Sequence, residues 1–161
     1  MHLAFSHLQT FVGQNYGAGK VKRMRKSVGV CLGMSYAGAF LVSGTLYALA
    51  GPLYRLFTTD ENVVRIGVDM MHFLLPSYFM YVVIGILSGA LRGAGRVLVP
   101  MLLTCGGVCL IRIIWMFGVF PGHPGINTIM LSYPVSWGIT AVLFVIYYFR
   151  KFPKVKTYRS D

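Results

Sequence analysis

Long apolar segments are the feature that most constrains this chain. They lie at about residues 27–50, 68–91, 97–119 and 126–149. An α-helix rises about 1.5 Å per residue, so each segment is long enough to cross a hydrocarbon layer of about 30 Å. Hydrocarbon offers no partners to backbone N–H and C=O groups, and a helix satisfies those groups within one segment. The sequence therefore predicts an all-α fold, a polytopic transmembrane bundle with four spanning helices.

The charge composition also indicates a membrane protein. Only 12% of the residues are charged and 56% are hydrophobic, whereas a soluble domain carries roughly twice that charged fraction. A net charge of +11 would suggest nucleic-acid binding in a soluble protein. Here most basic residues flank the apolar segments, where they set orientation and contact lipid headgroups. We therefore expect the lipid bilayer as a partner, and no nucleic acid.

Cysteine and histidine residues form no metal-ligand spacing. Cys105 and Cys109 are four residues apart and share a helix face, but two thiols within an apolar segment do not make a metal site. The histidines are dispersed along the chain. We expect no catalytic residues, no metal, no cofactor and no enzymatic activity.

The basic residues are distributed unevenly between the two sides of the predicted bundle. Twelve lie in the segment 13–26, the turn 92–96 and the C-terminal tail, whereas the opposite loops contain two, Arg55 and Arg65. Positively charged loops of membrane proteins stay in the cytoplasm. We therefore expect a multi-pass protein of the plasma membrane with both termini cytoplasmic.

Local signals predict where the helices begin and end. Residues 1–12 are apolar but reach only about 18 Å as a helix, so we interpret them as the end of a truncated helix, followed by a Gly-rich turn in 13–26. Thr58 and Glu61 match a capping box, which predicts a helix start near Thr58. Pro76 removes one backbone hydrogen bond from the second span and predicts a kink there.

Small residues predict where helices approach closely. Gly85, Gly89 and Gly93 form a GxxxGxxxG stripe on one face of the second span, where a second backbone can approach. The first span has small residues at the same four-residue spacing, which are Gly29, Gly33 and Ala37, then Gly44 and Ala48. We predict helix packing at both stripes.

One charged side chain lies deep within the apolar segments. Arg112 is about two-thirds of the way through the third span, and a charge at such a depth usually faces the bundle interior or a wet cavity. A long side chain that reaches carbonyls or headgroups and anchors the helix explains Arg112 equally well. No acidic residue lies mid-span, since Asp69 is at the edge of the second segment. The chain alone therefore offers no obvious coupling-ion site.

Polar and aromatic residues of the second span could line a substrate cavity. Ser77, Tyr81 and Ser88 share one helix face, and Tyr78 lies one residue round from it. Aromatic walls bind apolar cations through cation–π contacts. Interhelical hydrogen bonding and packing explain the same residues at least as well. The candidate substrate-cavity residues are therefore Ser77, Tyr78, Tyr81, Ser88 and Arg112.

Three motifs resemble one family of transporters. The stretches GQNYGAGKVKRMRK, LFTTDENV and LSGALRGAG are similar in order and spacing to the multidrug and toxic compound extrusion (MATE) family, in its bacterial branch. The resemblance implies a twelve-helix antiporter of two six-helix lobes that exports small organic cations or drugs in exchange for sodium ions or protons.

The resemblance also implies a place for this chain within the larger fold. The whole chain, 1–161, would be the C-terminal portion of the second lobe, and its four spans would be helices nine to twelve. Residues 1–12 would be the end of helix eight. The missing N-terminal helices of the same protein are then implied partners, and the chain alone is expected to be inactive.

The chain departs from the family pattern at the ion site. Some members carry a cation-binding carboxylate in the tenth helix, where this chain has Tyr81. Other members place the coupling carboxylate in the first helix, which has no counterpart here. The family's sodium site therefore does not transfer to this chain. Two alternative functions stay open, a lipid-linked oligosaccharide flippase of related fold and a non-transporting membrane helix module.

Overall fold

The fold consists of helices and the short turns between them. The computed structural model describes residues 2–152, with side chains described from residue 7 onward. No β-strand occurs within this range. The elements are α1 (His2–Gly17), α2 (Val21–Arg55), α3 (Glu61–Gly93), α4 (Leu98–Thr104), the π-helical turn η1 (Cys105–Leu110), α5 (Ile111–Gly118) and α6 (Ile126–Lys151).

Four helical stretches of the described chain are long and apolar enough to cross a membrane, which confirms the predicted all-α membrane bundle. They are α2, α3, the continuous run α4–η1–α5, and α6. Two of the helices extend well beyond the predicted spans, since α2 has 35 residues and α3 has 33. At about 1.5 Å per residue each is roughly 50 Å long, so its ends reach past the hydrocarbon layer.

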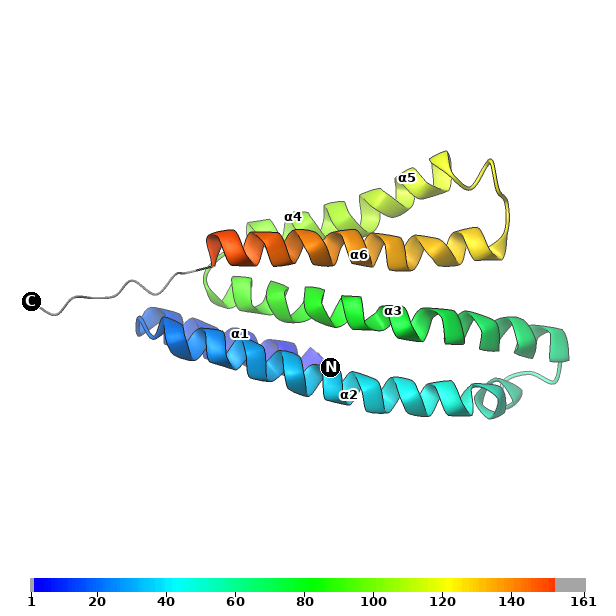
Figure 1. The fold of residues 1–161 in the computed structure, drawn as a ribbon, viewed down its shortest axis with the longest axis horizontal. Coiled ribbons are helices and arrows are strands. Elements are labelled where there is room, and N and C mark those ends of the chain that lie inside the picture. Colours follow the sequence, from blue (N-terminus) through cyan, green and yellow to red (C-terminus); the bar gives the residue numbers. More distant parts are fainter. Residues whose placement is uncertain (1, 153–161) are drawn as a thin grey trace, which may run out of the picture.

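The helices run lengthwise past one another, and α3 is central (Figure 1). It packs against α1, α2 and α6, while α4, η1 and α5 pack along α6. The α1–α2 turn, the α3–α4 turn and the end of α6 lie at one end of the bundle, which we call the basic end (Figure 1). The α2–α3 and α5–α6 loops lie at the other, which we call the loop end. The basic end takes its name from Lys20, Lys22, Arg23, Arg25, Lys26, Arg92, Arg96, Arg150 and Lys151.

The turn predicted directly after residue 12 is wrong, because α1 continues to Gly17. Asn15 supports this last turn of helix by donating a hydrogen bond from Nδ2 to the Phe11 carbonyl at 2.8 Å. The chain reverses instead at Gly19, where φ is +68°. That conformation is easily adopted only by a residue without a Cβ. The tight basic turn after α3 is built in the same way, with Gly95 at φ +77°.

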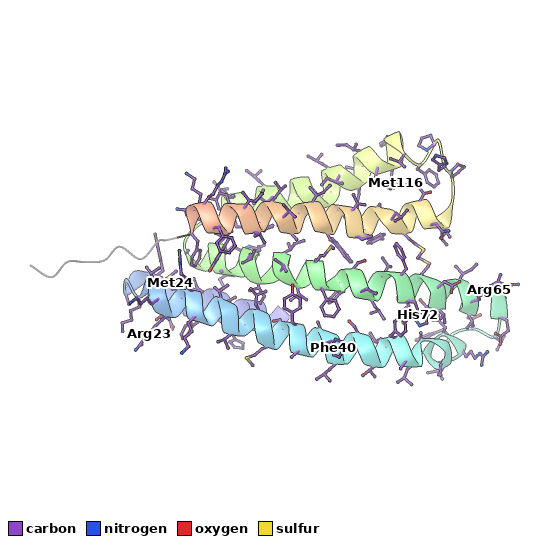
Figure 2. All side chains as sticks on the ribbon, viewed as in Figure 1. Arg23, Met24, Phe40, Arg65, His72 and Met116 are labelled. Carbon is purple, nitrogen blue, oxygen red and sulfur yellow. The ribbon has the colours of Figure 1, made fainter. Side chains whose placement is uncertain are left out.

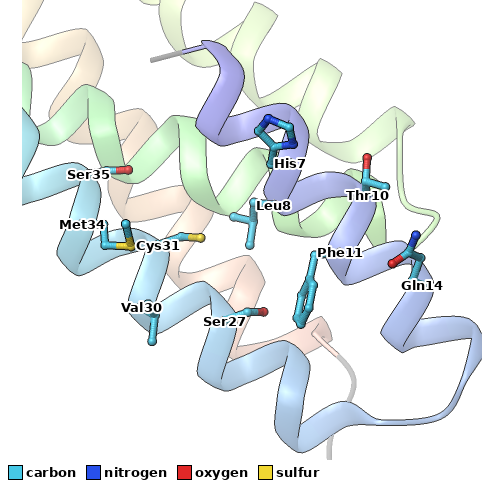
Figure 3. Close-up of a pocket in the computed structure, with 10 residues that line it drawn as sticks. All are labelled: His7, Leu8, Thr10, Phe11, Gln14, Ser27, Val30, Cys31, Met34 and Ser35. Carbon is cyan, nitrogen blue, oxygen red and sulfur yellow. The ribbon is translucent and has the colours of Figure 1, made fainter.

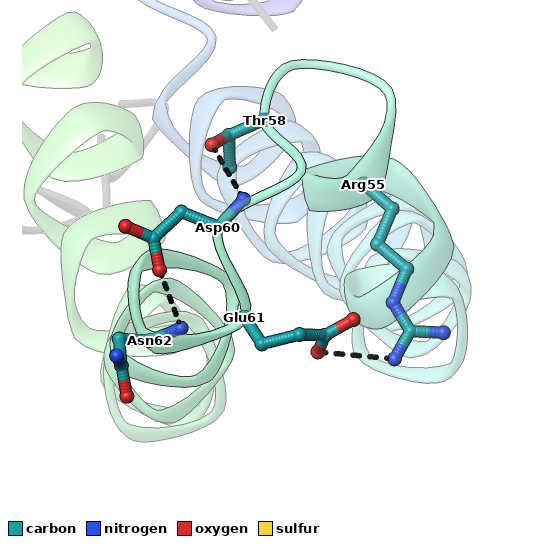
Figure 4. A network of polar contacts seen from close by, with 5 residues as sticks. All are labelled: Arg55, Thr58, Asp60, Glu61 and Asn62. Atoms are coloured by element: carbon teal, nitrogen blue, oxygen red, sulfur yellow. Dashed lines mark hydrogen bonds and ion pairs between the residues drawn. The ribbon is translucent and has the colours of Figure 1, made fainter.

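The predicted capping box at the start of α3 is also wrong (Figure 4). Asp60 is the N-cap, and its carboxylate accepts a hydrogen bond from the Asn62 N–H at 2.9 Å. The Thr58 hydroxyl accepts from the Asp60 N–H at 3.2 Å and thus shapes the loop before the helix. Glu61 turns away to pair with Arg55 at 3.3 Å. Both of those side chains are largely exposed, so their pair adds little stability.

Glycines mark the closest helix contacts. A Cβ on Gly93 would lie 2.5 Å from the Gln9 carbonyl oxygen of α1, so α1 and α3 touch through their backbones at this point. A Cβ on Gly107 of η1 would overlap the side chain of Thr140 on α6. Along the same stripe as Gly93, Gly89 is buried and Gly85 is half-buried.

The small residues that α2 buries are not the predicted ones. No described atom lies within 4 Å of a Cβ built on Gly29 or Gly33, so these glycines make no close contact within the described chain. The small residues buried on α2 are instead Ser35, Ala39 and Ser43. Glycine spacing alone does not say which face of a helix meets its neighbour.

Large apolar side chains cover the outside of the bundle (Figure 2). Phe40 on α2 is 70% exposed and Phe117 on α5 is 82% exposed. A soluble monomer rarely exposes such continuous apolar surface, whereas lipid tails or neighbouring helices cover it in a membrane. In the same view, Arg23 lies at the basic end of the bundle and Arg65 lies at the loop end.

Candidate functional site

Four aromatic side chains from α3 and α6 contact one another. Trp137 is central: its ring centroid lies 5.6 Å from that of Tyr81, 5.8 Å from Tyr133 and 6.4 Å from Tyr78. Tyr78 and Tyr81 are themselves 5.6 Å apart. Offset and edge-on pairs at these distances are the arrangements that aromatic rings prefer. We call Tyr78, Tyr81, Tyr133 and Trp137 the aromatic cluster.

Arg112 of α5 reaches across to this cluster. Its guanidinium carbon lies 4.0 Å from the centroid of the Tyr133 ring and 5.9 Å from that of Trp137. Its Nε donates a hydrogen bond to the Ser136 hydroxyl at 3.3 Å. Cation–π contacts of this kind strengthen where water is excluded. The structure therefore brings the one mid-span charge of the described chain onto aromatic faces.

Interactions between α5, η1 and α6 hold Arg112 in place. The Trp115 indole N–H donates to the Thr128 carbonyl at 2.8 Å, which ties α5 to the start of α6. One turn before α5, the π-helical turn η1 presents Gly107 to Thr140, so the two helices approach closely there. A π-helical turn widens the helix and changes the direction of the side chains after it. Arg112 lies directly after this turn.

The structure brings together three of the five predicted cavity residues. Tyr78, Tyr81 and Arg112 meet through the rings of α6. Ser77 is half-buried outside the cluster, and Ser88 is buried. The Ser88 hydroxyl has no hydrogen-bond partner in the described part of the chain. Ser77 and Ser88 therefore do not join the site that Tyr78, Tyr81 and Arg112 form with the rings of α6.

The site residues of α6 were not among those predicted from the sequence. Tyr133, Ser136 and Trp137 are spaced at i, i+3 and i+4, and so lie on one face of a helix. That pattern could have been found, but nothing in the sequence shows that this face meets Arg112.

Two apolar grooves adjoin one another along α2. The first has a volume of about 580 Å³ and lies between α1 and α2, lined by Leu8 and Phe11 among others (Figure 3). The second has about 710 Å³ and lies between α2 and α3, where Tyr78 contributes to its wall. The two share Met34 and Ser35. Both volumes are within the range of pockets that hold drug-sized ligands.

The acidic side chains of the described chain all lie toward the loop end. Asp60 and Glu61 are at the loop end, and Asp69 is two turns into α3 from it. The described residues contain no group of three His, Cys, Asp or Glu side chains that could hold a metal ion. The only ion pair among the described residues joins Arg55 and Glu61. Arg112 therefore forms no ion pair with a described residue.

A comparison of the sequence with known families decides which family this bundle represents. The MatE family model matches residues 6–117, more than half of the chain. The chain belongs to the MatE family. The MatE match starts in α1 and ends in α5, so it includes the site residues of α3 and Arg112 but not those of α6.

Two curated relatives carry names of the same kind. The chain is 21% identical to "Probable multidrug resistance protein YoeA" of Bacillus subtilis (strain 168) over 140 residues, which is 86% of this chain and 30% of that protein. It is 29% identical to "Protein DETOXIFICATION 7" of Arabidopsis thaliana over 86 residues, 53% of this chain and 17% of that protein. The chain thus spans under a third of the length of either relative. No solved structure matches it.

Proposed function

We propose that this MatE chain is part of a plasma-membrane transporter that exports drugs or small organic cations in exchange for sodium ions or protons. The family match over residues 6–117 carries the proposal. The words "multidrug resistance" and "detoxification" in the names of the two relatives support export of toxic compounds. The helices of the rest of such a protein are then this chain's partners.

In this proposal, the aromatic cluster and the grooves beside α2 form part of the wall of the substrate path. Tyr78 belongs to both, since it lines the second groove and contacts Trp137. Aromatic faces attract flat or cationic compounds through dispersion and cation–π contacts. Transporters of this general kind expose a central site to one side and then to the other, by rocking one bundle against another.

The orientation is proposed from charge. The nine basic residues of the basic end lie together at one end of the bundle, and positively charged ends of membrane helices stay in the cytoplasm. The C-terminal tail, which contributed to the predicted count, lies outside the described residues from 153 onward. In this arrangement the α1–α2 turn, the α3–α4 turn and the end of α6 are cytoplasmic, and the α2–α3 loop faces outward.

The coupling ion is proposed to act through residues outside this chain. Proton and sodium relays in membranes use carboxylates or histidines, and the described spans have no mid-span carboxylate. The flippase alternative calls for a strongly cationic cavity, to which the described spans contribute one mid-span cation, Arg112. A non-transporting bundle is the remaining alternative.

Drug efflux from cells tests the proposal. The full reading frame containing this chain is expressed in a bacterial host that lacks its own efflux pumps, and loss of preloaded ethidium is followed by fluorescence. We expect faster loss than in the vector control, and slower loss when the sodium or proton gradient is collapsed. The 161-residue chain by itself should match the vector. Efflux at vector level from the full frame, at verified expression, would contradict the proposal.

A further inference from the structure

A third groove opens between the end of α3 and the spanning run α4–η1–α5. It has a volume of about 440 Å³, within the range of pockets that hold ligands. Its lining residues are Arg92, Val97, Met101, Thr104, Cys105, Val108 and Cys109. The Thr104 hydroxyl donates to the Pro100 carbonyl at 2.6 Å, so its hydrogen is already used within the helix. The groove therefore combines one cation, Arg92, with a wall that carries no other charge.

The length of the groove matches half of a bilayer. Its lining residues from Val97 to Cys109 recur at intervals that place them on one helix face. At about 1.5 Å per residue this stretch is roughly 18 Å long, and one leaflet of a hydrocarbon core of about 30 Å is about 15 Å deep. Arg92 is in the last turn of α3, at the basic end (Figure 1). The cation is thus at the depth of lipid headgroups, and the apolar wall is at the depth of acyl chains.

Two arginines flank the α3–α4 turn and have different contacts. Arg96 donates from Nη1 to the Tyr147 hydroxyl at 3.2 Å, which ties the turn to α6. Arg92 lines the groove instead, and its side chain is exposed. A guanidinium binds a phosphate through two parallel N–H···O hydrogen bonds. Arg92 is therefore placed to bind a phosphate at the membrane surface.

The groove face of α4 and η1 differs from the face that packs on α6. Gly107 faces α6, where an added Cβ would overlap Thr140, and close helix contacts in membranes use such small residues. On the groove face, Val97 is 55% exposed and Met101 is 60% exposed. Flexible side chains such as methionine adapt to irregular apolar partners. A phospholipid supplies, in one molecule, both the anion that Arg92 fits and the flexible chain that this wall fits.

We propose that this groove binds one anionic phospholipid, with its phosphate on Arg92 and an acyl chain along α4 and η1. Basic pockets at the cytoplasmic ends of membrane helices hold anionic headgroups, because each basic residue there attracts anionic lipid. The proposed orientation assigns the lipid to the cytoplasmic leaflet. The site goes beyond the proposed export function and does not depend on it.

Lipid binding by the purified protein tests the site. The protein encoded by the full reading frame is purified in detergent, delipidated, and titrated with dioleoyl-phosphatidylglycerol or dioleoyl-phosphatidylcholine. Native mass spectrometry gives the affinity for the first bound lipid. We expect the parent protein to prefer phosphatidylglycerol. Arg92→Gln should weaken phosphatidylglycerol binding roughly 5-fold, as expected for one basic residue near a membrane surface, and should change phosphatidylcholine binding little.

Matched variants separate the charge of Arg92 from the charge of the basic end, and the groove from the fold. Arg150→Gln removes an exposed charge outside the groove and should change neither affinity. Arg92→Lys keeps the charge but loses the planar fork, so its phosphatidylglycerol affinity should lie between those of the parent and Arg92→Gln. Cys109→Phe places a ring in the apolar part of the groove and should weaken binding of both lipids. Leu110→Phe, at the next and equally exposed position outside the groove, should weaken neither. Size-exclusion profiles establish which variants fold.

Equal affinity of the parent protein for the two lipids overturns the site. That is the result expected if a helix from the rest of the protein occupies the groove. Equal losses in Arg92→Gln and Arg150→Gln also overturn it, because the attraction would then come from the basic end as a whole. Cys109→Phe leaves Arg92 in place, so equal binding by Cys109→Phe and Leu110→Phe refutes the groove even if Arg92→Gln does not fold. Binding is measured without transport, so failed efflux with intact lipid selectivity would refute the export function alone.

Discussion

Replacing Gly93 by alanine perturbs the contact between α1 and α3 directly. The new Cβ would lie 2.5 Å from the Gln9 carbonyl oxygen and 2.9 Å from the Cβ of Val12. Neither atom can rotate away, because one belongs to the backbone and the other is the first atom of its side chain. α1 must therefore move away from α3, or α3 must bend.

The size of the effect follows from two opposing contributions. Overpacking of a close contact costs about 1–3 kcal/mol. Alanine in place of glycine in a helix restores roughly 0.5–1 kcal/mol, because the unfolded chain is less flexible. The net expectation for Gly93→Ala is a loss of about 0–2.5 kcal/mol in the free energy of unfolding, centred near ~1 kcal/mol. Titration with SDS in mixed micelles, followed by circular dichroism, measures that quantity.

A second glycine provides the matched control. Gly33 of α2 is also helical, but no described atom lies within 4 Å of a Cβ built there. Gly33→Ala should therefore leave the free energy of unfolding unchanged or raise it slightly. If Gly93→Ala is as stable as Gly33→Ala, then α1 does not pack on α3 through this glycine and the described helix contact is wrong.

Two further predictions concern the start of α3 and the orientation of the bundle. Asp60→Ala removes the N-cap and should lower the free energy of unfolding by about 1 kcal/mol, more than Thr58→Ala does. Equal losses for the two variants in SDS titrations would instead support the capping box predicted from Thr58 and Glu61. In a background without native cysteines, Thr59→Cys should react with an impermeant maleimide in intact cells, and Lys22→Cys only after permeabilisation. The reverse pattern would invert the proposed topology.

Much of the fold was predictable because the bilayer restricts the options. Uncharged stretches such as 27–50 exceed the thickness of hydrocarbon, so helices across the membrane are the physical solution. Helix ends were less predictable. At the start of α3, Thr58 and Asp60 are both good caps, and the choice depends on the loop that leads in from Arg55.

The candidate site was predictable only in part. Arg112 stood out because a charge in an apolar segment is costly, and the tyrosines stood out on α3. Their meeting through Trp137 depends on how α5 and α6 pack, and on the π-helical turn before Arg112. Those relations join residues far apart in the sequence. Local periodicity therefore shows that a face is polar or aromatic without showing what it faces.

Transport by the purified protein tests the central proposal most directly. The full reading frame is purified and reconstituted into liposomes, and ethidium movement is followed under an imposed sodium or proton gradient. We expect ethidium accumulation that depends on one of the two gradients and stops when that gradient is dissipated. Accumulation no greater than in protein-free liposomes, under either gradient, would contradict it.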